Sequence, residues 1–145
     1  MKDGARSEIR DSPSEAPPGP EGFLTAEVER IARTLDEPGT AVIATDPAGR
    51  ILFWSDGARA LYGWSCDEVL GRDVVEVTPS ELSQAEATAI MTALRGGAVW
   101  SGRFIVRDKQ GRRFLAEVKD VPIRDDRGAL IGMVGTSRRI QYMGR

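Results

Sequence analysis

Hydrophobic and polar positions change their period along the chain. Over residues 24–35 apolar side chains recur at helical spacing, and charged side chains take the other face. Residues 41–45 and 51–54 are short, β-prone apolar runs separated by a turn that contains proline and glycine. We therefore predict an amphipathic helix over 23–36, with order beginning at about Thr25, followed by a β-hairpin.

The middle of the chain carries signals for helix ends. Ser55 is a cap residue for a short helix that ends at Gly63, and the Ser-x-x-Glu run at 65–68 is a capping box for a second one that ends at Gly71. The run Thr-Pro-Ser-Glu at 78–81 places Pro at the first helical position, so we predict that a longer helix starts there. The pattern predicts two short helices and one long one.

The last third of the chain is predicted to be β. Three strand-length runs cover residues 99–107, 113–121 and 129–137, and turns rich in Asp and Gly join them. In the second run Phe114, Ala116 and Val118 alternate with more polar positions, so one face is dry. These elements predict an α+β domain with a five-stranded antiparallel sheet and its helices on one side.

The ends of the chain differ from its centre. Residues 1–22 contain four prolines, few large apolar residues and mixed charge, so we predict a disordered tail. With 145 residues, the chain holds one domain, which we place at 37–140, after the helix at 23–36 and before a short C-terminal tail at 141–145.

Composition narrows the function. The net charge of −2 gives no field that favours nucleic acid or an anionic membrane, and the longest apolar runs have four residues. The chain contains no His and one cysteine, Cys66, which excludes imidazole metal ligands, Ser-His and Cys-His dyads and intrachain disulfides. We expect a cytoplasmic protein that binds or senses and is not an enzyme.

Several short motifs follow one another in a fixed order between residues 37 and 140. They lie at 45–51, 58–72, 100–102, 108–111, 122–128 and 132–135. Together they resemble the PAS domain family, and the Ala-Leu-Tyr-Gly-Trp-Ser stretch within 58–72 is the most specific part. The resemblance implies a PAS fold that encloses a small pocket and serves as a sensor or interaction module.

Flavin photochemistry is the first activity that the resemblance raises. Light-sensing PAS domains of the LOV type carry a Gly-x-Asn-Cys run whose Cys attacks the flavin. The matching run here ends in Asp73-Val74, the last-strand Gln of these domains is replaced by Ser137, and the chain has no Asn. Covalent flavin chemistry is therefore not expected, whereas non-covalent flavin binding stays open.

Haem is the second cofactor to weigh. Haem-binding PAS sensors usually supply a His, and this chain has none. Met91 and Cys66 are alternative ligands in principle, but Met91 is more simply a core side chain on an apolar helix. We expect no bound cofactor.

The family's geometry implies a pocket with an almost wholly apolar lining. The candidate residues are Val74, Val77, Ile90 and Leu94 from the helices and Phe104, Val106, Ala116, Val118, Met133 and Ser137 from the sheet. Such a lining suits a small hydrophobic ligand and not a charged metabolite. The alternative is a ligand-free scaffold for protein–protein interaction. Asp120 has inward-facing parity on its strand, and its role stays open.

The apolar stripe of the first helix predicts an interface. Leu24, Val28, Ile31 and Leu35 form that stripe. It either folds back on the sheet, whose outer face offers Ile105 and Leu115, or pairs with the same helix in a homodimer, which we predict. The chain is either a fragment of a larger signalling protein or a stand-alone domain that acts on a signalling effector by binding another chain. We favour the second.

Overall fold

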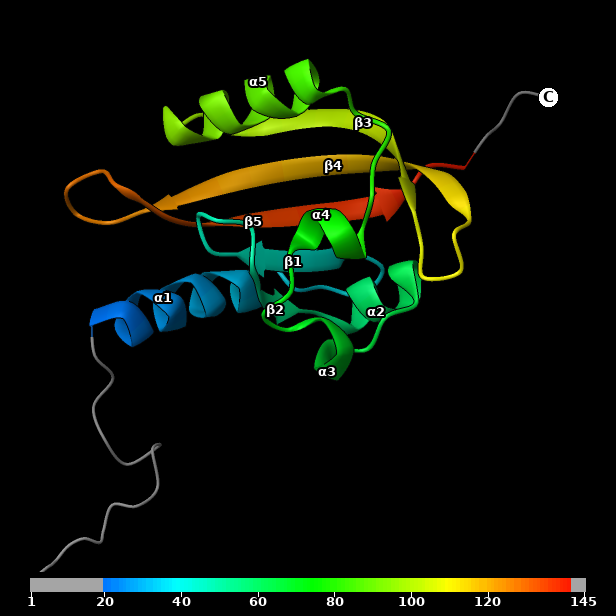
Figure 1. Cartoon of the computed structure of the whole chain (residues 1–145). Coiled ribbons are helices and arrows are strands. Elements are labelled where there is room, and N and C mark those ends of the chain that lie inside the picture. The colour runs from blue at the N-terminus through cyan, green and yellow to red at the C-terminus, as the bar shows by residue number, and fades with distance from the viewer. Residues whose placement is uncertain (1–19, 142–145) are drawn as a thin grey trace, which may run out of the picture.

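Five antiparallel strands form one sheet in the order β2-β1-β5-β4-β3 (Figure 1). The computed structural model describes residues 20–141, without the side chains of Pro20, Glu21 and Phe23. The strands are β1 (Ala41–Thr45), β2 (Ile51–Trp54), β3 (Trp100–Arg107), β4 (Arg113–Arg124) and β5 (Leu130–Arg139). This is the α+β sheet that the hydrophobic pattern predicts.

The strand bounds agree with the prediction at the first hairpin and differ at the last one. β1 and β2 have the predicted bounds, whereas β4 continues to Arg124, past the predicted end at Val121. Pro122 pairs with Met133 of β5, but the pairing of β4 with β3 ends at Asp120. Pro122 therefore lies where β4 is locally an edge strand, and its missing N–H costs no ladder bond.

Four helices pack on one face of the sheet: α2 (Asp56–Tyr62), α3 (Cys66–Val69), α4 (Val74–Val77) and α5 (Gln84–Arg95). The predicted caps of α2 and the predicted capping box at the start of α3 are confirmed, whereas α3 ends at Val69, before the predicted end at Gly71. The Ser55 side chain accepts a hydrogen bond from the Ala58 N–H at 3.1 Å, and Gly63 ends α2 in the left-handed region. Ser65 and Glu68 form the predicted capping box at α3.

The predicted start of the long helix at 78–81 is wrong. α5 begins at Gln84, after a capping box of Ser83 and Glu86. Thr78 instead ends α4, a single turn that the sequence analysis missed, and its hydroxyl donates to the Val74 carbonyl at 3.0 Å. Two start signals lie five residues apart, and only the second leaves the intervening segment free to pair with β3.

That segment is tied to β3 by backbone contacts. Ser80 forms a β-bridge with Val106, and the Glu81 N–H donates to the Ile105 carbonyl at 2.9 Å. These contacts hold the chain extended between α4 and α5, so α5 lies over β3 and β4 (Figure 1).

Helix α1 (Pro20–Thr34) lies on the opposite face of the sheet from these four helices, which agrees with the predicted alternative that its apolar stripe folds back on the outer face. It begins three residues before the predicted start at 23, because proline suits the first turn of a helix. The rest of the predicted tail, residues 1–19, and residues 142–145 lie outside the described residues. The stripe packs over β1, β2 and β5 rather than on Ile105 and Leu115.

A glycine lets α1 approach the sheet closely. A Cβ at Gly132 would lie 2.7 Å from Val28 Cγ2 and 2.7 Å from the Thr45 carbonyl oxygen, so no larger residue fits there without movement. Val28 and Ala32 are fully buried as a result, while Leu24 and Leu35 stay exposed.

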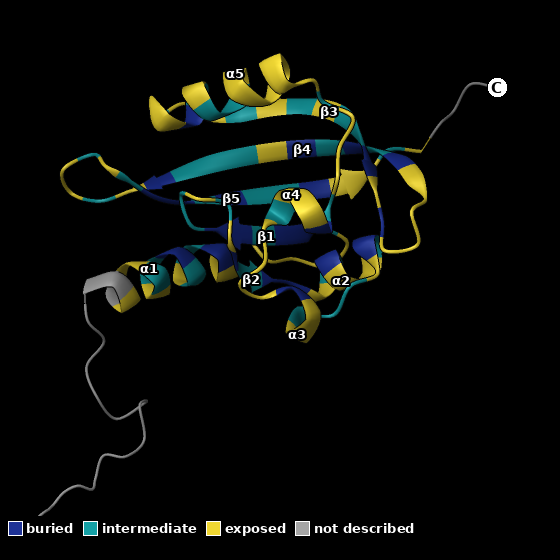
Figure 2. Cartoon of the chain, viewed as in Figure 1, coloured by how far each residue is buried: buried dark blue, intermediate teal, exposed yellow. Residues whose placement is uncertain are grey.

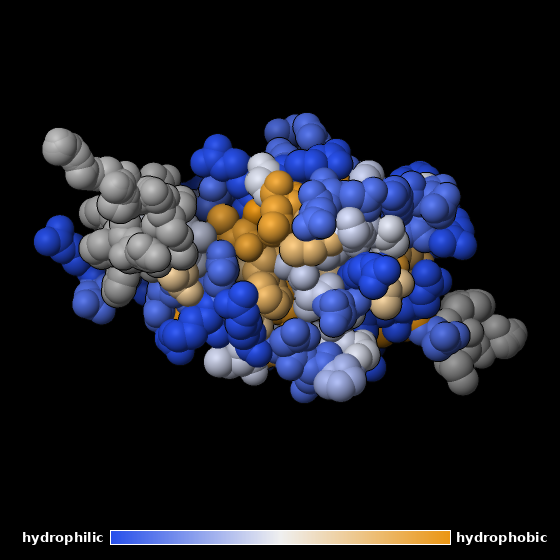
Figure 3. All heavy atoms as spheres, turned by 90° about the horizontal axis from the view of Figure 1, so that it is seen from below, coloured by the Kyte–Doolittle hydropathy of each residue, from blue (hydrophilic) through white to orange (hydrophobic). Residues whose placement is uncertain are grey.

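Two hydrophobic clusters therefore share the sheet, one on each face. The cluster under α1 contains Val28, Ala32, Val42, Ala44, Ile123, Ile131 and Val134. The cluster under the other helices includes Ile51, Trp54, Tyr62, Val77, Phe114, Ala116 and Val118. Strand β1 is buried along almost its whole length, and the outward sides of the helices are exposed (Figure 2). Seen from below, the surface is mainly hydrophilic around one apolar area (Figure 3).

Candidate ligand-binding cavity

A cavity of about 250 Å³ lies between the inner face of the sheet and helices α4 and α5. All the strands except β2 contribute to its wall. Most of the lining is apolar. The lining includes Thr45, Tyr62, Val74, Ile90, Met91, Leu94, Phe104, Val118, Asp120, Met133, Gly135 and Ser137.

The structure brings most of the sequence-predicted lining residues together here. Those that line the cavity are Val74, Ile90, Leu94, Phe104, Val106, Val118, Met133 and Ser137. The other two, Val77 and Ala116, do not line it, which corrects the prediction for them. Both are fully buried among core side chains of the inner cluster. Strand and helix parity identifies the inward face, but it does not tell which inward side chains other atoms cover.

Asp120 is the lining residue with the most unusual environment. It lies on β4, level with Trp100 of β3 and Gly135 of β5 in the sheet register. A Cβ at Gly135 would lie 2.6 Å from Asp120 Oδ1, so the carboxylate occupies the space above that glycine. Burial raises the pKa of Asp120 from its ordinary value of 3.8 to about 6.

Tyr62 provides a second polar group that the sequence analysis missed. It is the last residue of α2, and its hydroxyl lies 3.0 Å from the Ser137 hydroxyl on β5. Burial raises the pKa of Tyr62, the Ser137 hydrogen bond opposes that rise, and the negative charge of Asp120 adds to it. The Tyr62–Ser137 pair joins the end of α2 to the sheet at the cavity wall.

Two of the three positions that bear on cofactor chemistry lie at the cavity wall. Val74, at the position that the sequence resemblance assigns to the reactive Cys of LOV domains, lines the cavity with an aliphatic side chain. Met91 also lines the cavity, whereas Cys66 lies in α3 against the core. Among the described residues, no three His, Cys, Asp or Glu side chains gather in a way that could hold a metal ion.

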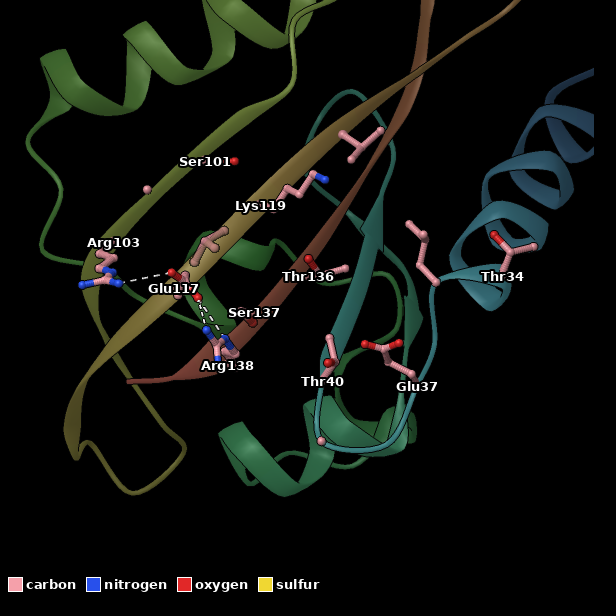
Figure 4. A pocket seen from close by; sticks show the side chains of 15 residues that line it. Thr34, Glu37, Thr40, Ser101, Arg103, Glu117, Lys119, Thr136, Ser137 and Arg138 are labelled. Carbon is pink, nitrogen blue, oxygen red and sulfur yellow. Dashed lines mark hydrogen bonds and ion pairs between the residues drawn. The ribbon is translucent and has the colours of Figure 1, made fainter. Parts of the chain in front are cut away.

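A second, larger hollow of about 930 Å³ lies on the outer face of the sheet, beside the end of α1 (Figure 4). Its wall combines apolar surface with charged and hydroxyl side chains. Glu117 at its centre makes ion pairs with Arg138 at 2.6 Å and Arg103 at 3.4 Å, and both are drawn in Figure 4. All three side chains are substantially exposed, so water screens the pairs and each contributes little. We therefore place the candidate ligand site in the inner cavity.

Comparison with known proteins identifies the family. The chain matches the PAS fold family over residues 27–140 and belongs to that family. Rice (Oryza sativa subsp. japonica) phototropin-2 is 29% identical over 112 residues, which are 77% of this chain and 12% of phototropin-2. The chain thus spans about an eighth of the length of that relative.

Solved structures agree with the family. The PAS domain of a protein from Colwellia psychrerythraea has a TM-score of 0.65 at 25% identity, covering 79% of this chain and 97% of that one. An RNA-binding light-oxygen-voltage receptor has a TM-score of 0.65 at 21% identity over 86% of this chain and 36% of that one. The chain is thus a PAS domain. None of the helices among residues 20–141 is long and apolar enough to span a membrane.

Proposed function

We propose that this PAS domain is a non-catalytic sensor that binds a small, largely apolar ligand in the inner cavity. The observation that carries the proposal is the cavity itself, which offers about 250 Å³ of largely apolar space between the sheet and helices α4 and α5. Ligand pockets usually measure about 300–1,000 Å³, so this one suits a molecule at the small end of that range. Its apolar wall supplies the binding free energy by excluding water.

Flavin does not fit the residues that line this cavity. The position of the flavin-reactive Cys is occupied by Val74, and the chain has no Asn with which to bind the flavin ring. The cavity is also smaller than the pockets that take drug-sized molecules. We therefore propose that the relationship to phototropin-2 reflects the shared fold and not shared photochemistry.

Strand β5 offers a route by which occupancy of the cavity reaches the outside of the domain. Met133, Gly135 and Ser137 face the cavity, whereas Gly132 and Val134 lie under α1 on the other face. A ligand that displaces β5 therefore also changes the surface on which α1 packs. We propose that the signal leaves through α1, to a second copy of the chain or to an effector protein.

A ligand-free scaffold is the second candidate function. The outer hollow, with its mixed charges, and the two exposed leucines of α1 would support protein–protein contacts without any ligand. We propose that the domain has no nucleic-acid partner, because the net charge is −2 and Arg103 and Arg138 on the outer face are paired with Glu117. We also propose no enzymatic activity for it. We also propose that the protein acts in the cytoplasm.

Native mass spectrometry of the full chain purified from cells separates the two functions. The sensor function predicts an added mass that is lost on denaturation. Ile90→Trp, which fills the cavity from α5, should abolish the added mass, and Ala89→Trp on the exposed side of the same helix should retain it. If the wild type and Ile90→Trp each show only the mass calculated from their own sequence, the result would favour the scaffold.

A further inference from the structure

We propose that the inner cavity selects small apolar amines, and that the Asp120 carboxylate receives the protonated amino group. This inference rests on the proposed function, because it assigns the chemical class of the ligand of that cavity. Its basis is the distribution of charge over the cavity wall.

Asp120 is the sole charged residue among those that line the cavity. The other polar side chains of the lining carry hydroxyls, and these belong to Thr45, Tyr62, Thr78, Ser80, Thr136 and Ser137. Neither Lys nor Arg lines the cavity, and none of the described residues forms an ion pair with Asp120. The protein therefore places one negative charge in an apolar cavity and supplies no cation to balance it.

The position of this charge is built into the sheet. Asp120 lies on β4, flanked by β3 and β5, and the absent side chain of Gly135 leaves room for the carboxylate on the inner face. On the β3 side, Asp120 pairs in register with Trp100, whose ring packs at a tilted angle against the ring of Phe104. The carboxylate thus has a fixed place beside apolar walls, which is the arrangement that orients a ligand with one polar end.

A protonated amine complements this site better than the other ligand classes. An ionised carboxylate only accepts hydrogen bonds, so it pairs with a donor, and a charged donor forms the stronger bond. Asp120 is half-buried, and a charge that is partly removed from water without a partner costs free energy, which a bound cation offsets. An anionic ligand would meet repulsion from Asp120, and a pure hydrocarbon would leave the carboxylate dehydrated and unpaired.

Ionisation of Asp120 at neutral pH is compatible with this role. Burial raises its pKa to about 6, so the carboxylate is the major form at pH 7.5. The residues that face Asp120 from the surrounding elements are Tyr62 of α2, Trp100 of β3, Gly135 of β5, and Ile43 and Thr45 of β1. Of these side chains Tyr62 alone titrates, and its pKa is raised. From α4 and α5 the cavity receives no titratable side chain.

A matched set of probes tests the inference on the full chain. The probes are 2-phenylethylamine, 2-phenylethanol, ethylbenzene and 3-phenylpropionate, which share a ring and differ in the polar end. Binding is measured by saturation-transfer NMR and calorimetry at pH 7.5 for the wild type, Asp120→Asn and Asp126→Asn. Asp126 is an exposed acidic residue in the turn between β4 and β5, so its variant controls for the loss of one negative charge.

We expect the amine to bind at least about tenfold more tightly than the alcohol, which corresponds to 1.4 kcal/mol, and the carboxylate probe not to bind. Asp120→Asn should remove the preference for the amine and leave binding of the alcohol within about twofold, whereas Asp126→Asn should keep the preference. Equal binding of amine and hydrocarbon, or an amine preference that survives in Asp120→Asn, would overturn the inference and leave the proposed sensor function intact. Binding of none of the probes would also overturn it, and the mass measurement above then judges the sensor function separately.

Discussion

The carboxylate of Asp120 on β4 occupies the space that a side chain at Gly135 on β5 would need. The two residues pair across the sheet, and a Cβ at Gly135 would lie 2.6 Å from Asp120 Oδ1. The sheet therefore accommodates a carboxylate on its inner face, where most neighbouring side chains are apolar. This arrangement lowers the stability of the empty domain and gives the cavity its one charge.

Asp120→Asn should stabilise the protein at neutral pH and not at acid pH. The pKa of Asp120 is raised from 3.8 to about 6 on folding, so the folded state binds the proton more tightly than the unfolded state. Stability is therefore lost as the pH rises from about 4 to about 6, and the loss persists above that range. Removing the charge should raise the unfolding free energy at pH 7.5 by about 2 kcal/mol.

Urea unfolding of both proteins at pH 7.5 and at pH 4 measures this difference. The gain at pH 4 should be much smaller, because Asp120 is already largely protonated there in the folded state. Equal effects of the substitution at the two pH values would show that the Asp120 side chain is solvated rather than buried.

Gly132→Ala should destabilise the domain by disturbing the packing of α1 against the sheet. The added methyl group would lie 2.7 Å from both Val28 Cγ2 and the Thr45 carbonyl oxygen, and the backbone atom cannot rotate away. Overpacking of this kind costs about 1–3 kcal/mol. Gly96→Ala is the matched control, because its new Cβ would meet no atom closer than 3.5 Å. Thermal melting of the two variants should separate them clearly, and identical melting temperatures would contradict the close packing of α1.

Gly71→Val should lower stability through the backbone alone. Gly71 has a φ of 83° and no heavy atom within 4 Å of a built Cβ, so sterics with neighbours play no part. A β-branched residue in the left-handed region costs on the order of 1–2 kcal/mol, and Asn costs less. The melting temperature of Gly71→Asn should therefore lie between those of the wild type and Gly71→Val. A wild-type melting temperature for Gly71→Val would refute the left-handed conformation.

The protein purified from cells should show neither a flavin band nor a Soret band. Val74 replaces the flavin-reactive thiol at the cavity, and the chain has no His with which to hold haem iron. An absorption spectrum recorded after gel filtration checks this expectation. A visible band that stays with the protein peak would contradict it.

The homodimer prediction now centres on the exposed ends of the α1 stripe. Val28 is fully buried against the chain's own sheet, whereas Leu24 and Leu35 are 36% and 37% exposed. Light scattering should give the mass of two chains for the wild type and of one chain for Leu24→Glu/Leu35→Glu. A wild-type mass of one chain would refute the homodimer. A dimeric double variant would place the interface elsewhere, on the exposed face of the sheet.

Local chemistry made the strands and both ends of α2 predictable from the sequence. Ser55 and Gly63 carry cap and turn signals that act within a few residues, and both function in the structure as predicted. The start of α5 was not predictable in this way, because the signals at Thr78 and Ser83 compete locally. Pairing of Ser80 with Val106 decides between them, and that contact spans 26 residues of sequence.

For the cavity, the sequence predicts which face of the sheet a side chain lies on, but not how deeply that side chain is covered by others. Alternation along β4 correctly places Val118 and Asp120 on the inner face. It also places Ala116 there, but neighbouring side chains cover that residue completely. Tyr62 was missed because its place at the cavity depends on how α2 crosses the sheet, which no repeat of apolar positions encodes.

The most direct test of a ligand cavity with Asp120 in its wall is an NMR titration of the Asp120 carboxyl carbon, with and without 2-phenylethylamine. The structure predicts a pKa of about 6 in the free protein and a clear downward shift when the protonated amine binds beside the carboxylate. An ordinary Asp pKa that the amine leaves unchanged would contradict both the burial of Asp120 and its place in the ligand site.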